Sequence, residues 1–378
     1  MKYNPGHFQP NVWQRITKII SSNRIGSAYL FSGPEGTGKE AAALAFSAAL
    51  NCQGNEIICG SCSSCVRFSS LQHEHLHVII PLPRKKANFD KDTDVLSIIG
   101  DDNAALLTDL LQKKGTDPFQ KINIPRAKRI LINSIRELRK KLYLKSVDSG
   151  YKMVLIFDAH CLSDGDGASA NALLKLLEEP PKKTTVILVT DHKLMLLSTI
   201  QSRCQQIDFP PISHDIVSTY LTDRGIHSGE AEFYANLADG NIHKARFLAD
   251  RTVAEILKTM KDQVEAVVNS NGDGWRSYIN NMSRMVRSDP NNFKFHLFLL
   301  QTWFQQSVRF RQNISSPLAQ NGFGEALKTF TTSYPQANLT TANSVIETTI
   351  ASIDRNFYMP LTLTNMLIDI QHYLKGKA

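Results

Sequence analysis

Short apolar runs alternate with helix-forming segments along the first half of the chain, and this alternation predicts an α/β fold. Residues 28–32, 153–157 and 186–190 are apolar runs bounded by polar residues, which favours buried strands. Residues 40–50 are rich in alanine, and residues 168–179 are followed by two prolines, so both segments predict helices. We therefore expect a mostly parallel sheet with helices between its strands.

The second half of the chain has no clear strand-like run after Pro210. Apolar residues there recur at helical spacing, for example Leu297, Leu300 and Phe304, which predicts an all-helical region. Residues 81–120 are different, because prolines, glycines and charges are scattered through them without a period. We interpret this segment as an insertion or long loop that is partly ordered at best.

A glycine-rich loop separates the first predicted strand from the first predicted helix. Residues 33–40 read GPEGTGKE, which is close to the phosphate-binding pattern G-x-x-x-x-G-K-[S/T]. Backbone N–H groups of such a loop, with the following helix N-terminus, bind phosphate oxygens, and the lysine reaches the β- and γ-phosphates. The candidate nucleotide-binding residues of this loop are Gly33, Gly36, Gly38 and Lys39.

Two positions depart from the pattern of a working nucleotide hydrolase. Glu40 stands where a hydroxyl normally ligates magnesium, and its charge would lie close to the phosphates. Asp158 follows a predicted strand and would hold magnesium, but Ala159 replaces the second acid, which positions the attacking water. We expect catalysis within this chain to be lost. Binding of ATP or ADP stays open, as does a glycine turn without a ligand.

Four cysteines form a cluster with the spacing C-x6-C-x2-C-x2-C, namely Cys52, Cys59, Cys62 and Cys65. Four thiolates can enclose one tetrahedral zinc ion and leave no ligand position for water, so the predicted role of the metal is structural. The alternative is a set of free thiols. Cys161 and Cys204 lie far along the chain, and we expect them to be packing thiols.

Composition permits an acidic partner and argues against a membrane protein. The net charge is +8 and the isoelectric point is about 9.1, so nucleic acid is a plausible partner. No apolar run approaches the roughly 18 residues of a membrane span, and the first residues have no apolar signal core. We expect a cytoplasmic protein without a membrane partner, in which disulfides are uncommon.

Residues 126–145 carry a strong excess of positive charge beside an apolar stripe that includes Ile135, Leu138 and Leu142. A helix with this pattern buries one face and presents a basic one. The basic face would contact DNA phosphates, or it is simply solvated. The cationic residues are Arg126, Lys128, Arg129, Arg136, Arg139, Lys140, Lys141 and Lys145.

Two further segments carry a family resemblance. Residues 171–181 read NALLKLLEEPP and residues 202–204 read SRC. Together with the glycine loop and the cysteine cluster, they make the chain resemble the delta-prime family of bacterial DNA polymerase III clamp-loader subunits, of the AAA+ class. The resemblance covers residues 1 to about 250. The chain departs from the family in a shorter first cysteine gap, a longer segment 81–120, and His243 where a sensor arginine is usual.

The resemblance implies a fold class and a domain order. We expect an α/β AAA+ module with a parallel sheet of the P-loop type, carrying the cysteine insertion, at residues 1–210. A small helical lid would follow at residues 211–250. An all-helical collar that serves oligomerisation would form residues 251–378.

The resemblance also implies a function. The chain would be a largely non-catalytic subunit of the clamp loader, without ATPase activity alone, that helps to load the sliding clamp onto primed DNA. Its expected partners are gamma/tau-like and delta-like subunits, the clamp and primer–template DNA. Arg203 would be an arginine finger that reaches ATP held by a neighbouring subunit; the alternative is a surface arginine that closes a strand.

Two rival functions stay open on the sequence. Lys39 and Asp158 are retained, as in a catalytically active gamma/tau-like ATPase subunit. The cysteines and the basic segment alone would suit a stand-alone zinc-containing DNA-binding protein. An ATPase measurement tests the first rival, and capture of partner subunits tests the second.

Overall fold

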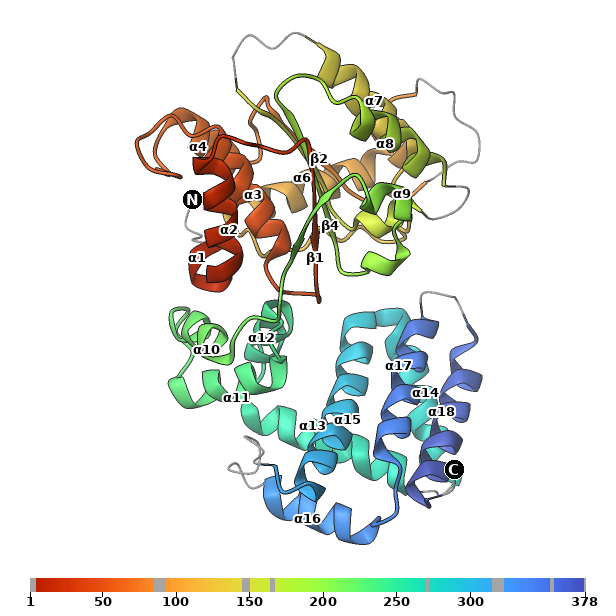
Figure 1. Ribbon diagram of the computed structural model, residues 1–378. Coiled ribbons are helices and arrows are strands. Elements are labelled where there is room, and N and C mark those ends of the chain that lie inside the picture. Colours follow the sequence, from red (N-terminus) through yellow and green to blue (C-terminus); the bar gives the residue numbers. More distant parts are fainter. Residues whose placement is uncertain are drawn as a thin grey trace. The chain divides into compact units, whose positions relative to one another are not determined.

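The computed structural model describes residues 5–84, 93–144, 150–163, 167–269, 272–314, 323–353 and 357–376. The chain divides into two compact units, coloured by sequence in Figure 1. Unit 1 comprises residues 1–217 and 239–244, and unit 2 comprises residues 218–238 and 245–378. The boundaries that we predict at residues 210 and 250 stay predictions.

Unit 1 is built on a five-stranded parallel sheet with the order β2-β3-β4-β1-β5. β1 lies between β4 and β5, and its Leu30 pairs with Leu188 of β4 and Gln206 of β5. The expected α/β fold with a parallel sheet is therefore confirmed. The strands are β1 Ala28–Ser32, β2 Leu76–Ile79, β3 Lys152–Ile156, β4 Thr184–Thr190 and β5 Gln205–Asp208.

Alternate residues of the central strands face two separate cores, because side chains of a strand point to opposite faces. Tyr29 and Phe31 of β1 face the core beneath the helices from α2 to α6, whereas Leu30 faces the core beneath α7, α8 and α9. Figure 1 shows α2, α3 and α4 on one side of the sheet and α7, α8 and α9 on the other. The helices and 3-10 turns of unit 1 are α1 Pro5–Phe8, α2 Pro10–Ser21, α3 Lys39–Leu50, α4 Ser63–Ser69, α5 Val95–Ile99, α6 Asp101–Thr116, α7 Ile132–Tyr143, η1 Ala159–Leu162, α8 Ala168–Glu178, η2 Lys193–Met195 and α9 Ser198–Gln201.

Two strands, β2 and β5, were not predicted from the sequence. β5 has one buried residue, Ile207, between exposed polar neighbours, because it lies at the edge of the sheet. β2 is the other edge strand, and Leu76 is its one buried residue, while the other three are half-buried. Edge strands of this kind lack the continuous apolar run by which buried parallel strands are recognised.

The segment 81–120 contains two helices, so our expectation of a long loop was wrong for residues 95–116. Asp94 caps α5 by accepting a hydrogen bond from the backbone N–H of Leu96. The aliphatic side chains of α6, including Leu107 and Leu111, pack against the core on the α3 face of the sheet. Tertiary packing rather than a regular apolar period holds this segment in place. Residues 85–92 lie outside the described part.

The described residues of the chain after Pro210 contain helices and no strand, as predicted. The longest of the described helices, α15, buries Leu297, Leu300 and Phe304, which are the residues whose spacing predicted it. The helices are α10 His214–Thr222, α11 Ser228–Ala238, α12 Ile242–Ala249, α13 Val253–Val268, α14 Gly272–Ser288, α15 Pro290–Arg311, α16 Phe323–Ser333, α17 Leu339–Ser352 and α18 Met359–Leu374. None of the described helices combines the length and apolar character needed to cross a bilayer.

Candidate functional site

The glycine loop connects the end of β1 to the start of α3, as its sequence predicts. Its glycines are needed where they stand. Gly36 and Gly38 have φ of 72° and 82°, in the left-handed region that other residues avoid. A Cβ at Gly33 would lie 2.2 Å from the carbonyl oxygen of Phe209, and one at Gly36 would lie 1.9 Å from Oδ1 of Asn241. The strand–loop–helix frame of a phosphate site is therefore intact.

Lys39, the residue that would reach the phosphates, is bound within the protein. Its Nζ lies 2.8 Å from Oδ1 of Asp191 and donates to the loop carbonyls of Gly33, at 2.9 Å, and Pro34. Burial lowers the pKa of the Lys39 ammonium, although Asp191 favours the charged form. Asp191 follows β4 directly, so the ion pair ties the loop to the neighbouring strand. This contact takes the place of a phosphate contact.

Glu40, the residue that replaces the magnesium-ligating hydroxyl, forms an ion pair with Lys114 of α6. The Lys114 side chain is only 1% exposed. Burial by itself would raise the pKa of Glu40, but Lys114 and Lys121 outweigh burial and the pKa is lowered. Glu40 is therefore an ionised carboxylate that is neutralised from inside the protein.

Lys121 contacts the remaining carboxylates in and around the glycine loop. Its Nζ lies 3.6 Å from Asp158, 3.5 Å from Asp191 and 3.6 Å from Glu35. Burial opposes the charge, but these carboxylates outweigh it and raise the pKa of Lys121. Asp158 lies at the end of β3, as predicted, and burial is the main cause that raises its pKa. The ammonium of Lys121 thus occupies the space among these carboxylates.

The loop site, by which we mean residues 35–41 with Lys114, Lys121, Asp158, Asp191 and His243 around them, is nearly filled. The cavity that remains measures about 20 Å³, which is room for one or two water molecules. Burial lowers the pKa of His243 and favours its neutral form, so it supplies no sensor charge. The residues present do not fit a magnesium–nucleotide in this arrangement.

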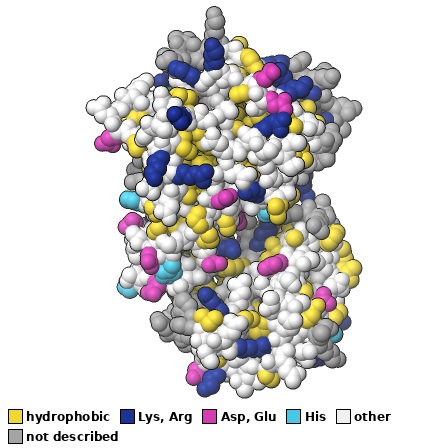
Figure 2. Space-filling model, viewed as in Figure 1, with side chains coloured by type: hydrophobic (Ala, Val, Ile, Leu, Met, Phe, Trp, Pro, Cys, Tyr) yellow, Lys and Arg dark blue, Asp and Glu magenta, His cyan; other side chains and the backbone are white. Residues whose placement is uncertain are grey.

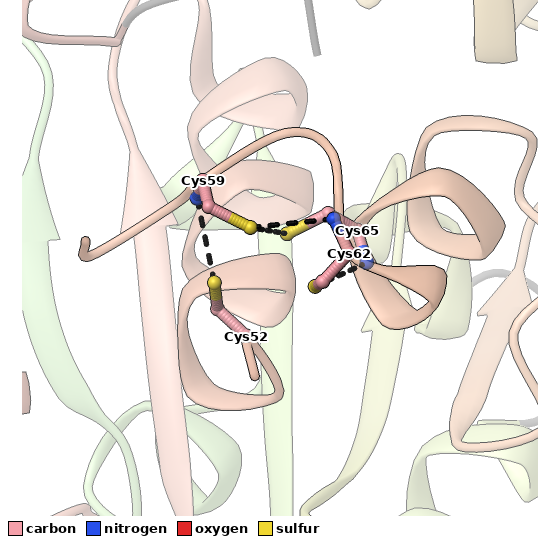
Figure 3. Close-up of side chains that lie close together, drawn as sticks. All are labelled: Cys52, Cys59, Cys62 and Cys65. Atoms are coloured by element: carbon pink, nitrogen blue, oxygen red, sulfur yellow. Dashed lines mark hydrogen bonds between the residues drawn. The ribbon is translucent and has the colours of Figure 1, made fainter. Parts of the chain in front are cut away.

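The four clustered cysteines meet at the junction of α3 and α4, and Figure 3 shows their sulfur atoms facing a common space. The four Sγ atoms lie within 4.8 Å of one another, and those of Cys59 and Cys65 are 4.0 Å apart. A tetrahedral zinc ion with Zn–S bonds of about 2.3 Å holds its sulfurs about 3.8 Å apart. The cysteines therefore fit a zinc ion with small adjustments.

Backbone N–H groups point at the sulfurs of Cys59 and Cys62, lower the pKa of both thiols and so favour their thiolate form. The N–H groups of Cys62 and Cys65 donate to the Sγ atoms of Cys59 and Cys62, each at 3.4 Å. The first of these bonds is the main cause that lowers the pKa of Cys59 to about 6. Cys62 also caps α4 through its sulfur, so one residue both starts the helix and is a candidate metal ligand. Burial raises the pKa of Cys65 to about 12, and a bound cation would offset that cost.

Arg203 lies just after α9 and contacts the other motif that carries the family resemblance. Its Nη2 lies 2.7 Å from Oε1 of Glu178 in α8, and its Nη1 donates to the carbonyl of Thr199 at 3.0 Å. The Arg203 side chain is 37% exposed. An exposed ion pair of this kind is weak, so the guanidinium can leave Glu178 for a stronger anionic partner.

Residues 132–143 of the basic segment form helix α7, with Ile135, Leu138 and Leu142 buried as predicted. Arg126, Lys128 and Arg129 precede this helix and are not helical, so our prediction of a helix was wrong for that part of the segment. Its basic face is exposed, and Figure 2 shows Lys and Arg side chains gathered where α7 lies in Figure 1. One opposing acid, Glu137, is paired with Lys141 at 2.6 Å. Lys145 lies outside the described residues.

Sequence reasoning missed three residues of the loop site. Asp191 follows a predicted strand, and a polar residue at the carboxyl end of a parallel strand is a recognisable signal. Lys114 and Lys121 lie in or just after the segment that we expected to be a loop, and nothing local distinguishes them from surface lysines.

Cys161 and Cys204 are buried in the core beneath α7 to α9, as expected for packing thiols.

A family model described as DNA polymerase III, delta subunit, matches residues 8–213 of this chain. Subunit delta' of DNA polymerase III from Bacillus subtilis (strain 168) is 31% identical over 232 residues, which cover 61% of this chain and 56% of the relative. Subunit tau from the same organism is 29% identical over 272 residues, which cover 68% of this chain and 40% of the relative. The chain thus spans about half the length of these curated relatives.

Among solved structures, the chain resembles a DNA polymerase III gamma subunit-related protein from Thermotoga maritima. The sequence identity is 14% and the TM-score 0.38, over 96% of this chain and 99% of that chain.

Proposed function

Because this chain belongs to the DNA polymerase III delta-subunit family, we propose that it is a largely non-catalytic subunit of the clamp loader, which helps to load the sliding clamp onto primed DNA. The resemblance to the delta-prime family, and with it the AAA+ fold class, is confirmed. The coarse assignment to the clamp-loader family of DNA polymerase III follows from the relatives. The subunit's role within the loader is our proposal.

The loop site is the observation that carries the non-catalytic role. Lys39 is paired with Asp191, Glu40 with Lys114, and Asp158 contacts Lys121. Each group that would act on a nucleotide therefore has a partner inside the protein. Ala159 is buried in η1 and has no acid to orient a water. A rival ATPase function would require all three contacts to break.

Arg203 would act in trans on ATP that a neighbouring gamma/tau-like subunit holds. The support is its exposure, its weak pairing with Glu178, and its place beside the segment 171–181. An arginine that neutralises charge in a phosphoryl-transfer transition state contributes roughly 10³–10⁵ in rate. The basic face of α7 would contribute phosphate contacts to primer–template DNA within the assembled loader.

The test is the ATPase of a reconstituted loader that contains wild-type chain or Arg203→Ala at equal assembly, checked by gel filtration. We expect the DNA- and clamp-stimulated rate to fall in part, because one neighbouring site loses its arginine while the others keep theirs. Glu178→Gln is the matched control, since it removes the same ion pair but leaves the arginine, and it should retain the rate. Equal rates for wild type and Arg203→Ala would leave Arg203 as a surface residue.

A further inference from the structure

The segment that follows residue 93 brings two lysines to the glycine loop, and the inference drawn from them rests on the proposed non-catalytic role and deepens it. Lys114 lies near the end of α6 and Lys121 lies in the loop after it. Both ammonium groups contact carboxylates in the region where a bound nucleotide and its magnesium would lie in a working phosphate site.

We propose that residues 101–121 are a built-in occupant of the loop site: Lys114 and Lys121 supply the cations that magnesium would otherwise supply, and thereby close the site to magnesium–nucleotide. This inference concerns the chain by itself. It is independent of Arg203 and of assembly with other subunits.

Lys114 is enclosed by the protein, which distinguishes it from a surface lysine that happens to reach an acid. α6 packs so closely on the end of α4 that a Cβ at Gly115 would lie 2.9 Å from the carbonyl oxygen of Ser69. The Lys114 ammonium also lies 5.3 Å from the centre of the Phe157 ring, in a cation–π contact. Its neighbour Lys113 is 59% exposed and pairs with Asp109 of the same helix.

The turn that precedes Lys121 is anchored by two hydrogen bonds and one ring contact. The backbone N–H of Gln120 donates to the carbonyl of Asp117 at 2.8 Å, and that of Phe119 donates to the Asp117 carboxylate at 3.1 Å. The Phe119 ring packs on Phe8 with ring centres 4.8 Å apart. Lys121 is therefore delivered to the carboxylates by an ordered turn.

The charges at the site explain why these lysines are needed. Four carboxylates lie there, on Glu35, Glu40, Asp158 and Asp191, and Lys39 alone would leave them in strong mutual repulsion. Without Lys121, three of the four would face one space without a shared cation. Carboxylate oxygens in such a set are ligands that suit Mg²⁺ and Mn²⁺.

The experiment replaces the tethered cation with a free one. Thermal unfolding of the full chain is measured with and without Mn²⁺ for wild type, Lys121→Ala and the control Lys113→Ala. We expect Mn²⁺ at 50 times its dissociation constant to raise the Tm of Lys121→Ala by about 5 °C, and to leave wild type and Lys113→Ala unchanged. Adding Asp158→Asn to Lys121→Ala should abolish the shift. A Mn²⁺ shift in wild type, or none in folded Lys121→Ala, overturns the proposal.

A second measurement uses only the wild-type chain and decides the matter if Lys121→Ala does not fold. Lysines are acetylated briefly, and the extent at each position is read by mass spectrometry with and without magnesium–ATP. We expect Lys39 and Lys114 to react at least about tenfold more slowly than Lys113, with no effect of magnesium–ATP, because both are buried and ion-paired. Equal reactivity of Lys113 and Lys114, or protection of Lys39 only when magnesium–ATP is present, overturns the proposal.

Discussion

At the scale of single residues, Glu40 and Lys114 form a largely buried ion pair at the loop site. Lys114→Met leaves the Glu40 carboxylate without its partner, and we expect a loss of about 3 kcal/mol in the free energy of unfolding. Lys114→Met combined with Glu40→Gln should recover most of that loss, since no unpaired charge remains. Urea unfolding at pH 7 measures both values. Lys113→Met is the matched control and should change stability by under about 0.5 kcal/mol.

Two carboxylates of the loop site, Glu40 and Asp191, give the chain a specific response to acid. Glu40 and Asp191 have pKa values lowered from 4.5 and 3.8, so the stability they contribute is present above those values and is lost as the pH falls through the folded-state pKa values. Asp158 acts in the opposite direction, because its pKa is raised. We expect the pH dependence of unfolding below pH 4.5 to be shallower in Glu40→Gln/Lys114→Met than in wild type. Parallel curves for the two proteins would contradict this assignment.

At the scale of elements, the junction of α3 and α4 should depend on one zinc ion. Cys62→Ser is a sharp test, because serine also caps a helix N-terminus while the thiolate ligand is removed. We expect elemental analysis to fall from about one zinc per chain to well below that value. Hydrogen exchange of α4 should quicken while the sheet stays protected. The control Cys204→Ser changes a buried thiol outside the cluster, and we expect the zinc content of that variant to equal that of wild type.

At the scale of the whole molecule, the isolated chain should hydrolyse no ATP above background. Turnover of about 1 s⁻¹, at the low end of ordinary enzymes, would restore the ATPase rival, provided that Lys39→Ala abolished it. The retained Asp158 would then have to release Lys121, which lies 3.6 Å away. Activity that persists in Lys39→Ala would instead come from a contaminating enzyme, because it would not depend on the lysine of the loop site.

The sequence by itself determined those features that depend on neighbours along the chain. The buried strands at residues 28–32 and 186–190 follow from apolar runs, and the loop at residues 33–40 follows from glycine spacing. The cysteine cluster follows from spacing too, because ligands within fourteen residues can reach one ion with little chain between them. Patterns of this kind need no knowledge of the rest of the fold.

Only the tertiary structure decided what surrounds that loop. Lys114 meets Glu40 across 74 positions in the chain, and Lys121 meets Asp191 across 70. A lysine carries no local mark of the acid that it will face, and the packing of α6 on the core brings these groups together. The sequence did not predict the edge strand β5 for a related reason. Its single buried residue, Ile207, does not mark a strand by itself, and the strand is recognised only from its pairing with β1. Local patterns placed the loop, and long-range contacts determined that its charges are satisfied from within.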